Sequence, residues 1–332
     1  MLAFELSGEH ATLPSAEVTA CLEALGIRFR VELGLPRCLL VDADFSERIG
    51  QRLAMTRSII DVLGVSDASE PEIAEMVRGV ELSADRRLSF RVRVKNIGTP
   101  LSSAKLERRI GELVYDMGYS ASLDNPDFEL RAVLTGDKCV FGRTLSLIDS
   151  SVFERRRPQY KPFFYPGVLM PKVARVLVNL ARAVDMVFDP FCGTGGILVE
   201  AGLMGIHALG SDVQRKVLLG AKLNLVHYGA PFTLMYQDAR SLGLADDSVS
   251  AIACDIPYGH SAIILAGSRK ELLEDSLAEM HRGLRLGKRA VVVADRCIKD
   301  EMAAAGFESE QVHRQRVHRS LTRVIHVAVK PG

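Results

Sequence analysis

Hydrophobic and polar residues alternate over the first sixty positions in short segments that indicate a small mixed domain. The predicted strands cover residues 1–8, 28–34 and 37–44. The predicted helices cover residues 13–25 and 45–53. The resulting β-α-β-β-α order is close to a split βαβ, ferredoxin-like unit.

A second pattern follows and combines a strand, a helix and a hairpin. In residues 89–96 apolar and basic side chains alternate, and residues 103–118 form an amphipathic helix pattern with one basic side. Strands at residues 127–136 and 138–146 close this unit. The basic side chains on the two exposed faces are Arg91, Arg93, Lys95, Lys105, Arg108 and Arg109. A cationic face of this kind either contacts RNA or is simply solvated.

From residue 171 onward apolar strand segments alternate regularly with helical segments. This pattern predicts a parallel sheet with helices on both faces, and two long strand segments at the end of the chain add an antiparallel hairpin. The fold class is therefore α/β, with a C-terminal Rossmann-like domain preceded by α+β domains. We predict domain boundaries that give the segments 1–65, 66–150, a proline- and arginine-rich linker at 151–170, and 171–332.

A glycine-rich turn joins the first parallel strand to the next helix. Its glycines allow the backbone to turn tightly and to approach a ligand, and the helix that follows offers unpaired N–H groups. A tight turn without a ligand is the alternative interpretation. The loop residues expected to bind a cofactor are Asp189, Pro190, Phe191, Gly193, Thr194, Gly195 and Gly196.

Carboxylates at the ends of the next two strands indicate a nucleoside cofactor. Asp212 is placed to accept hydrogen bonds from ribose hydroxyls, and Asp238, followed by Ala239, is placed beside an adenine amino group. The glycine pattern differs from the G-x-G-x-x-G of NAD enzymes. The acidic residue that opens the loop suits S-adenosylmethionine, which carries a sulfonium and an ammonium group.

The fourth parallel strand ends in Asp255-Ile256-Pro257-Tyr258. This segment resembles the (D/N/S)-P-P-(Y/F/W) motif of amino-methyltransferases, with Ile256 in place of the first proline. Asp255 and the carbonyl of Ile256 can accept both hydrogens of an exocyclic amine, and Tyr258 offers a flat face for a flipped base. An aspartate that only caps a turn is the alternative. The positions of Cys192 and Cys254 favour buried side chains over a nucleophile for pyrimidine C5 methylation.

Composition and charge narrow the class of protein. The 332 residues are 48% hydrophobic and 25% charged, as in an ordinary folded protein, and the net charge is +1. That balance averages residues 1–150, with 18 basic and 23 acidic side chains, and residues 151–332, with 24 and 18. The six cysteines form no CxxC pair, so no metal site is expected. No signal peptide or apolar run long enough to span a membrane is visible, and we expect a cytoplasmic protein.

Taken together, these motifs resemble the archaeal tRNA guanine-10 N2-methyltransferases over the whole length. The resemblance rests on PFFYPGVLMPKVARVLVNLA, DPFCGTGGILVEAGLMG with GSDV, and HRSLTRVI near the end. It implies that Tyr165 helps to enclose the methionine end of the cofactor. The segments SFRVRVKN, LERRIGELV and NPDFELRAVL resemble a THUMP domain, which implies docking on the tRNA acceptor end.

The sequence therefore leads to one function hypothesis with named alternatives. The chain is expected to use S-adenosylmethionine to methylate the N2 amine of a guanosine in tRNA, at position 10, once or twice, without a metal. The alternatives are a guanosine at tRNA position 6 or in ribosomal RNA, and a catalytically silent tRNA-binding protein. An NAD-dependent dehydrogenase is contradicted by the loop. A monomer is compatible with the sequence, and so is an accessory protein.

Overall fold

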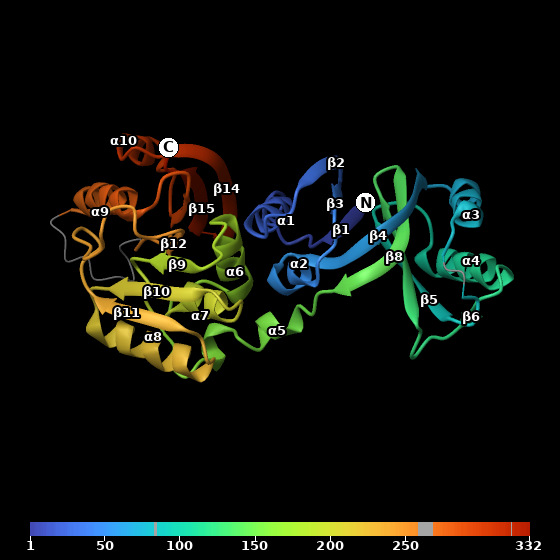
Figure 1. Cartoon of the computed structure of the whole chain (residues 1–332), viewed down its shortest axis with the longest axis horizontal. Coiled ribbons are helices and arrows are strands. Elements are labelled where there is room, and N and C mark those ends of the chain that lie inside the picture. The colour runs from blue at the N-terminus through green and yellow to red at the C-terminus, as the bar shows by residue number, and fades with distance from the viewer. Residues whose placement is uncertain (83–84, 258–267, 320) are drawn as a thin grey trace. The chain divides into compact units, whose positions relative to one another are not determined.

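The computed structural model describes residues 1–82, 85–257, 268–319 and 321–332, and the chain forms two compact units. Each unit is described by itself below (Figure 1). Unit 1 contains Met1–Ser15, Ile27–Gly50 and Met55–Asp149. Unit 2 contains Ala16–Gly26, Gln51–Ala54 and Ser150–Gly332. Two short segments from the N-terminal part of the chain thus belong to the same unit as the C-terminal half.

Unit 1 is built on one sheet with the strand order β2-β3-β1-β4-β8-β7-β5-β6. Its neighbouring strands are antiparallel, except that β5 runs parallel to β6 and β7. The strands are β1 (Leu2–Leu6), β2 (Phe29–Leu35), β3 (Cys38–Ala43), β4 (Thr56–Asp67), β5 (Ser89–Ile97), β6 (Ser120–Ala121), β7 (Phe128–Thr135) and β8 (Lys138–Leu147).

The helices of this part of the chain are α1 (Leu13–Ala24), α2 (Glu47–Arg52), α3 (Glu70–Gly79) and α4 (Ser103–Asp116). Helices α3 and α4 bury apolar side chains, including Val77 and Ile110, against Phe90 of β5 and Phe128 of β7. The amphipathic pattern of α4 therefore faces the sheet with its apolar side, as predicted. From β1 to β4 the elements follow the β-α-β-β-α-β order of a split βαβ unit.

Residues 54–88, for which the pattern predicted no element, contain β4 and α3. Strand β4 pairs with both β1 and β8, so the sheet is continuous through residue 65, where we expected one domain to end. The subdivision of the chain into domains at residues 65, 150 and 170 stays a prediction.

Unit 2 has the predicted Rossmann-like architecture, with the strand order β11-β10-β9-β12-β13-β15-β14. Strands β9 to β13 are parallel, and β14 and β15 form the predicted antiparallel hairpin. The strands are β9 (Met186–Asp189), β10 (His207–Asp212), β11 (Phe232–Tyr236), β12 (Ile252–Asp255), β13 (Arg289–Ala294), β14 (Glu308–His318) and β15 (Leu321–Val329).

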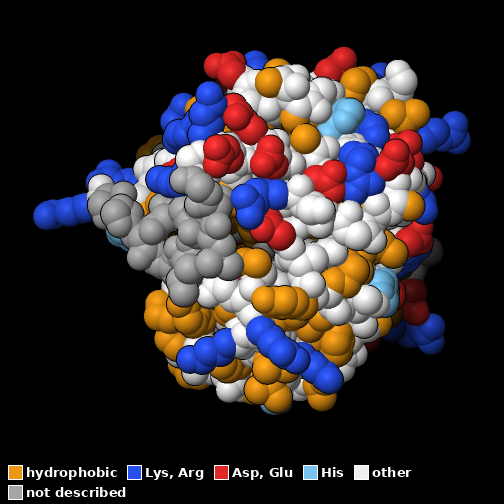
Figure 2. All heavy atoms as spheres, turned by 90° about the vertical axis from the view of Figure 1, so that its left-hand side faces the viewer, with side chains coloured by type: hydrophobic (Ala, Val, Ile, Leu, Met, Phe, Trp, Pro, Cys, Tyr) orange, Lys and Arg blue, Asp and Glu red, His pale blue; other side chains and the backbone are white. Residues whose placement is uncertain are grey.

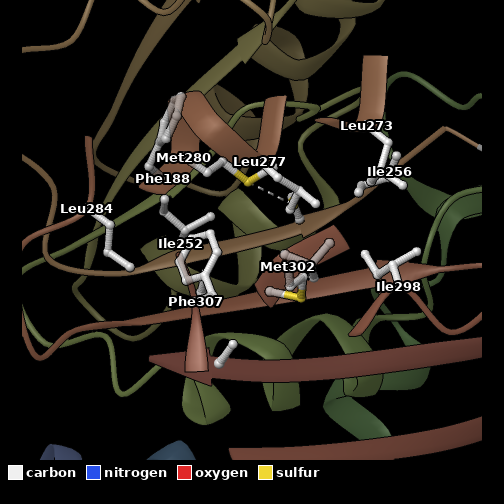
Figure 3. Close-up of a cluster of buried hydrophobic side chains, with 14 of the residues drawn as sticks. Phe188, Ile252, Ile256, Leu273, Leu277, Met280, Leu284, Ile298, Met302 and Phe307 are labelled. Atoms are coloured by element: carbon white, nitrogen blue, oxygen red, sulfur yellow. Dashed lines mark hydrogen bonds between the residues drawn. The ribbon is translucent and has the colours of Figure 1, made fainter. Parts of the chain in front are cut away.

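Helices cover both faces of this sheet because successive side chains of a strand point to opposite sides. In β10, Ala208 packs with α7 and α8, whereas Leu209 belongs to the cluster that includes α9 and α10. Figure 3 shows the second cluster, in which Phe188 of β9 and Ile252 of β12 lie near Leu277 and Met302. The helices are α5 (Ser151–Glu154), the 3₁₀ turn η1 (Pro158–Tyr160), α6 (Pro171–Leu180), α7 (Gly196–Gly202), α8 (Arg215–His227), α9 (Arg269–Gly283) and α10 (Lys299–Ala304).

Helix α8 is apolar on its exposed side as well as on its buried side. Leu219, Leu223 and Val226 are all more than half exposed, while Ala221 and Leu225 are fully buried. Figure 2 shows hydrophobic side chains gathered with Lys and Arg at the lower end of the view, where Figure 1 places α8. Helix α8 is therefore not amphipathic in the usual sense. Its buried apolar residues pack in unit 2, and its exposed side is apolar as well.

A buried polar network ties the two N-terminal segments into unit 2. The Nδ2 of Asn179 in α6 donates to Glu17 Oε1 at 2.9 Å, and Arg52 Nε donates to Asn179 Oδ1 at 3.1 Å. The backbone N–H of Ala54 also donates to Glu17 Oε1, at 2.9 Å. Since Glu17 and Asn179 are fully buried, these hydrogen bonds satisfy groups that would otherwise be costly to remove from water.

Candidate active site

The glycine-rich turn begins at the carboxyl end of β9 and leads into α7. Gly193 and Gly195 have φ angles of 51° and 77°, in the left-handed region that other residues avoid, and Gly196 starts the helix. The Asp189 side chain is buried, and its Oδ1 accepts the N–H of Phe191 at 3.0 Å. Burial raises the pKa of Asp189 well above its usual range, and the charges of Asp212 and Asp255 raise it further.

Asp212 ends β10 and holds the loop from the neighbouring strand. Its Oδ2 accepts the N–H of Gly193 at 2.9 Å, and its Oδ1 accepts the N–H of Gln214 at 2.8 Å. Burial raises the pKa of Asp212, while these backbone hydrogen bonds oppose the increase. The structure thus brings Asp189, the glycine turn and Asp212 together at one edge of the sheet. Their contact with a cofactor stays a prediction.

Asp238 follows β11 and is paired with a neighbouring cation. Its carboxylate accepts Nε of Arg240 at 3.1 Å and NH2 at 2.7 Å, and it also accepts the backbone N–H of Arg240. These hydrogen bonds lower the pKa of Asp238, which is therefore an ionised acceptor at neutral pH. Ala239 beside it is buried. The predicted recognition of adenine at this position is not tested by these contacts.

A buried asparagine, which the sequence analysis missed, joins the segment before the loop to the loop itself. The Oδ1 of Asn224 in α8 accepts the N–H of Phe163 at 2.9 Å, and its Nδ2 donates to the carbonyls of Phe163 at 3.0 Å and Thr194 at 2.9 Å. The Phe163 ring lies over Gly220, where an added Cβ would come within 2.1 Å of it. Tyr165, predicted to enclose the cofactor, is 37% exposed. A signal for Asn224 was present, since it is an amide on the buried side of a helix.

A buried carboxylate in α7 anchors the linker. The Oε1 and Oε2 atoms of Glu200 accept Nε and NH2 of Arg156 at 2.9 and 3.0 Å, and Arg175 of α6 pairs with the same group at 2.9 Å. Lys161 is buried nearby, and burial lowers the pKa of its ammonium group. The arginine run of the linker is thus divided, because Arg156 binds Glu200 while Arg157 pairs with Glu154 at the surface.

Asp255 lies at the carboxyl end of β12, next to the strand that ends in Asp189. Ile256 is buried, and Pro257 lines a cavity of about 250 Å³ together with Leu273, Ile298 and other residues. A guanidinium nitrogen of Arg323 lies 3.7 Å from Asp255 Oδ2. Tyr258 lies outside the described residues. The described part of the predicted motif therefore stands at the same edge of the sheet as the glycine turn.

The six cations predicted to bind RNA lie in unit 1 and differ in their surroundings. Arg91 is engaged within the sheet, since its Nε donates to Glu129 Oε2 at 2.9 Å. Arg109 pairs with Glu112 on the exposed side of α4. The remaining four are partly or fully exposed and comprise Arg93, Lys95, Lys105 and Arg108. An RNA contact of these residues stays a prediction, and it is weakened for Arg91 by its partner.

Comparison with known proteins places this geometry in a family. A model of the RMKL-like methyltransferase domain matches residues 158–325. The tRNA (guanine(10)-N2)-dimethyltransferase of Methanothermobacter thermautotrophicus is 37% identical over 329 residues, which are 97% of each chain. The chain belongs to this dimethyltransferase family. The enzyme of the same name from Pyrococcus abyssi is 34% identical and covers 84% of this chain and 85% of its own.

Solved structures with a similar fold agree with this assignment. TrmN from Thermus thermophilus superposes with a TM-score of 0.55 at 22% identity, over 99% of this chain and 100% of its own. A putative methyltransferase complexed with SAH has a TM-score of 0.51 at 13% identity, over 100% and 98% of the two chains. These likenesses confirm the predicted Rossmann-like methyltransferase fold.

S-adenosylmethionine is the methyl donor of this dimethyltransferase family, and the residues present fit it. Carboxylates end three neighbouring strands at the glycine turn, and Asp189 carries a raised pKa that a nearby cation would lower. In the residues that the structure describes, no cluster of histidine, cysteine and acidic side chains could hold a metal ion, and no helix is long and apolar enough to cross a membrane.

Proposed function

We propose that this chain methylates the N2 amine of a guanosine in tRNA, with the guanosine at position 10 as the target and one or two methyl groups as the product. The observation that supports this proposal most directly is the position of Asp255 beside the glycine turn. An acceptor for amine hydrogens and the loop for a cationic cofactor meet at the ends of two paired strands, β9 and β12. Because tRNA is the substrate, we place the activity in the cytoplasm.

The proposed reaction needs few groups from the protein. The cofactor supplies a methyl group activated by its sulfonium. The exocyclic amine of guanine is a weak nucleophile because its lone pair is delocalised into the ring. Asp255 and the carbonyl of Ile256 accept the two amine hydrogens and so orient the nitrogen. As the N–C bond forms and the S–C bond breaks, the nitrogen becomes more acidic, and its proton passes to Asp255 or to solvent.

The surroundings of Asp255 are consistent with a flipped base. The adjoining cavity has apolar walls at Ile256, Leu273 and Ile298. Each of its three cations is paired with a carboxylate, and the pairs are Arg269–Asp295, Lys270–Glu274 and Arg296–Glu301. Extracting a base from an RNA stem requires such a space together with a stacking partner. We propose that Tyr258 provides that partner.

We further propose that unit 1 supplies the RNA-binding surface, with residues 1–65 as a ferredoxin-like domain and residues 66–150 as a THUMP domain. Lys105 and Arg108 lie on the exposed side of α4, and the Arg93 side chain is exposed on β5. Because Val92 packs beneath α4, Arg93 points from the opposite face of the sheet, so the cations of α4 and of β5 would contact phosphates from two separate faces of unit 1. Contacts of either kind make affinity salt-dependent. Residues 151–170 then connect this surface to the methyltransferase domain at 171–332.

The test is direct. Purified protein is incubated with methyl-labelled S-adenosylmethionine and a tRNA transcript, and methylated nucleotides are mapped by mass spectrometry. We expect label on the guanosine at position 10, and no label when inosine, which lacks the N2 amine, replaces it. Label at position 6 or on ribosomal RNA would change the assigned target. An Asp255→Asn variant that still transfers methyl groups at the wild-type rate would contradict the proposed role of this residue.

A further inference from the structure

A buried arginine reaches the candidate active site from a strand two positions away in the same sheet. Arg323 lies near the start of β15 and is only 5% exposed. Its NH2 donates to the carbonyl of Gly167, in the segment before α6, at 3.2 Å, and the same nitrogen lies 3.7 Å from Asp255 Oδ2. One side chain therefore connects the predicted catalytic residue to the segment that precedes the cofactor loop.

The strand register explains how this contact arises. Because β15 runs antiparallel to β13, its first residues lie at the edge where β12 and β13 end, with Val324 opposite Ala294. Asp255 stands opposite Val293 on the other side of β13. Neighbouring strands are about 4.8 Å apart, so a side chain from β15 must pass the end of β13 to reach β12. An arginine is long enough for this, and the small Ala294 leaves room beside it.

The charges around Asp255 indicate what this contact does. Asp189 faces Asp255 from β9, and its own pKa is raised partly by the Asp255 charge. Across the end of β13, Asp295 is already paired with Arg269 at 2.9 Å. Arg323 places a cation beside Asp255. A carboxylate next to another carboxylate in a partly buried site tends to keep its proton unless a cation is close.

The hydrogen bonding of Arg323 also indicates that its charge matters more than its donors. Its Nε is buried and has no hydrogen-bond partner in the described part of the chain. At 3.7 Å the contact with Asp255 is an ion pair and too long for a hydrogen bond. An arginine kept only for stability is expected to use its buried donors, since an unsatisfied N–H is costly. This one leaves a donor unused while its charge stays beside Asp255.

We propose that Arg323 is a positioning residue that holds its charge beside Asp255 and so keeps Asp255 ionised for the target amine. The proposal rests on the proposed function, in which Asp255 accepts amine hydrogens. Only the carboxylate form of Asp255 can accept both a hydrogen bond and a proton. Removing the guanidinium takes a positive charge away from a carboxyl that lies next to Asp189, so the Asp255 carboxyl retains a proton at higher pH.

The first experiment is a pH profile of single-turnover methyl transfer to tRNA between pH 5.5 and 9. For Arg323→Met we expect the acidic limb to move up by about one to two pH units, so the deficit relative to wild type is largest at pH 5.5, shrinks steadily as the pH rises, and is absent by pH 9. Arg323→Lys keeps the charge on a shorter side chain and is expected to lie between the two. The binding of S-adenosylmethionine, measured by calorimetry, is expected to change less than about threefold.

Arg289→Met is the matched control. Arg289 lies at the opposite end of the same two strands and pairs with Glu310 at 2.9 Å. The Arg289→Met substitution removes a guanidinium from the sheet at a site away from Asp255, and the pH profile of this variant is expected to be that of the wild type. Profiles of Arg323→Met and Arg323→Lys that run parallel to the wild type, reduced equally at every pH, would show a purely structural role and overturn the proposal.

A second measurement separates this inference from the proposed function. In protein labelled with ¹³C at the aspartate carboxyl groups, the Asp255 signal is assigned by its loss in Asp255→Asn and titrated by NMR. We expect its pKa to be higher in Arg323→Met than in wild type, whether or not tRNA is methylated. An unchanged pKa refutes the role of Arg323, whereas a shifted pKa in a protein that methylates no guanosine refutes the proposed function alone.

Discussion

The arginine run at residues 155–157 offers a sharp test, because the structure gives two adjacent arginines opposite roles. Arg156 makes two hydrogen bonds to Glu200, and the two side chains are 13% and 0% exposed. Arg157 pairs with Glu154, and these side chains are 42% and 52% exposed. We expect Arg156→Met to destabilise unit 2 and Arg157→Met to leave its stability nearly unchanged.

The size of the effect follows from burial. Breaking a buried ion pair by removing one partner costs about 3–5 kcal/mol, because the other charge is left buried. Glu200 keeps Arg175, at 2.9 Å, so we expect a cost below this range, about 2–3 kcal/mol. An exposed pair such as Arg157–Glu154 contributes about 0–1 kcal/mol. For a unit of about 200 residues, Arg156→Met is expected to lower the melting temperature by roughly 5–10 °C.

Differential scanning calorimetry is the appropriate assay, since the chain has no tryptophan for fluorescence and its two units need not unfold together. Affinity for tRNA is measured on the same proteins below the transition. Equal stability of the two variants, accompanied by an equal loss of tRNA affinity, would refute this reasoning and identify the run as a phosphate-binding site.

Two further predictions concern the cofactor loop. Asn224→Leu leaves the backbone groups of Phe163 and Thr194 without their buried partner, so we expect S-adenosylmethionine to bind about tenfold more weakly. An unaltered affinity, measured by calorimetry, would show that Asn224 does not support the cofactor loop. Because the pKa of Asp189 is higher in the folded protein than in the unfolded chain, protonated Asp189 stabilises the cofactor-free protein at low pH. This stabilisation is complete below the carboxyl pKa of the unfolded chain, and it is lost as the pH rises through the pKa of the folded protein. Urea unfolding is therefore expected to show that the advantage of Asp189→Asn over wild type grows as the pH rises above about 4, whereas a constant difference would contradict the cause assigned to the shift.

Much of the methyltransferase unit was predictable because its signals are local. Alternation of apolar strands with helices gave the order of elements, and a residue at the carboxyl end of a parallel strand shares an edge with its counterparts. Asp189, Asp212 and Asp255 therefore come together as expected. The positive φ angles of Gly193 and Gly195 also follow from residue type.

The contacts that the sequence analysis missed depend on partners far along the chain. Glu200 looks like an ordinary helix-surface residue until Arg175 and Arg156, 25 and 44 positions away, enclose it. Arg323 reaches Asp255 only through the register of β13 and β15, which no local pattern specifies. Strand β4 was missed for a related reason, since its pairing with β1 and β8 decides its conformation more than its composition does.

The polar network around Asn179 has a consequence for the order in which the protein can fold during synthesis. Glu17 and Arg52 leave the ribosome 162 and 127 positions ahead of the asparagine that binds them. At about 5–20 residues per second, Glu17 waits roughly 8–30 s for this partner. The N-terminal segments that carry Glu17 and Arg52 therefore lack their partner while the sheet of unit 1 forms. The core of unit 2 is completed only after Asn179 has been synthesised.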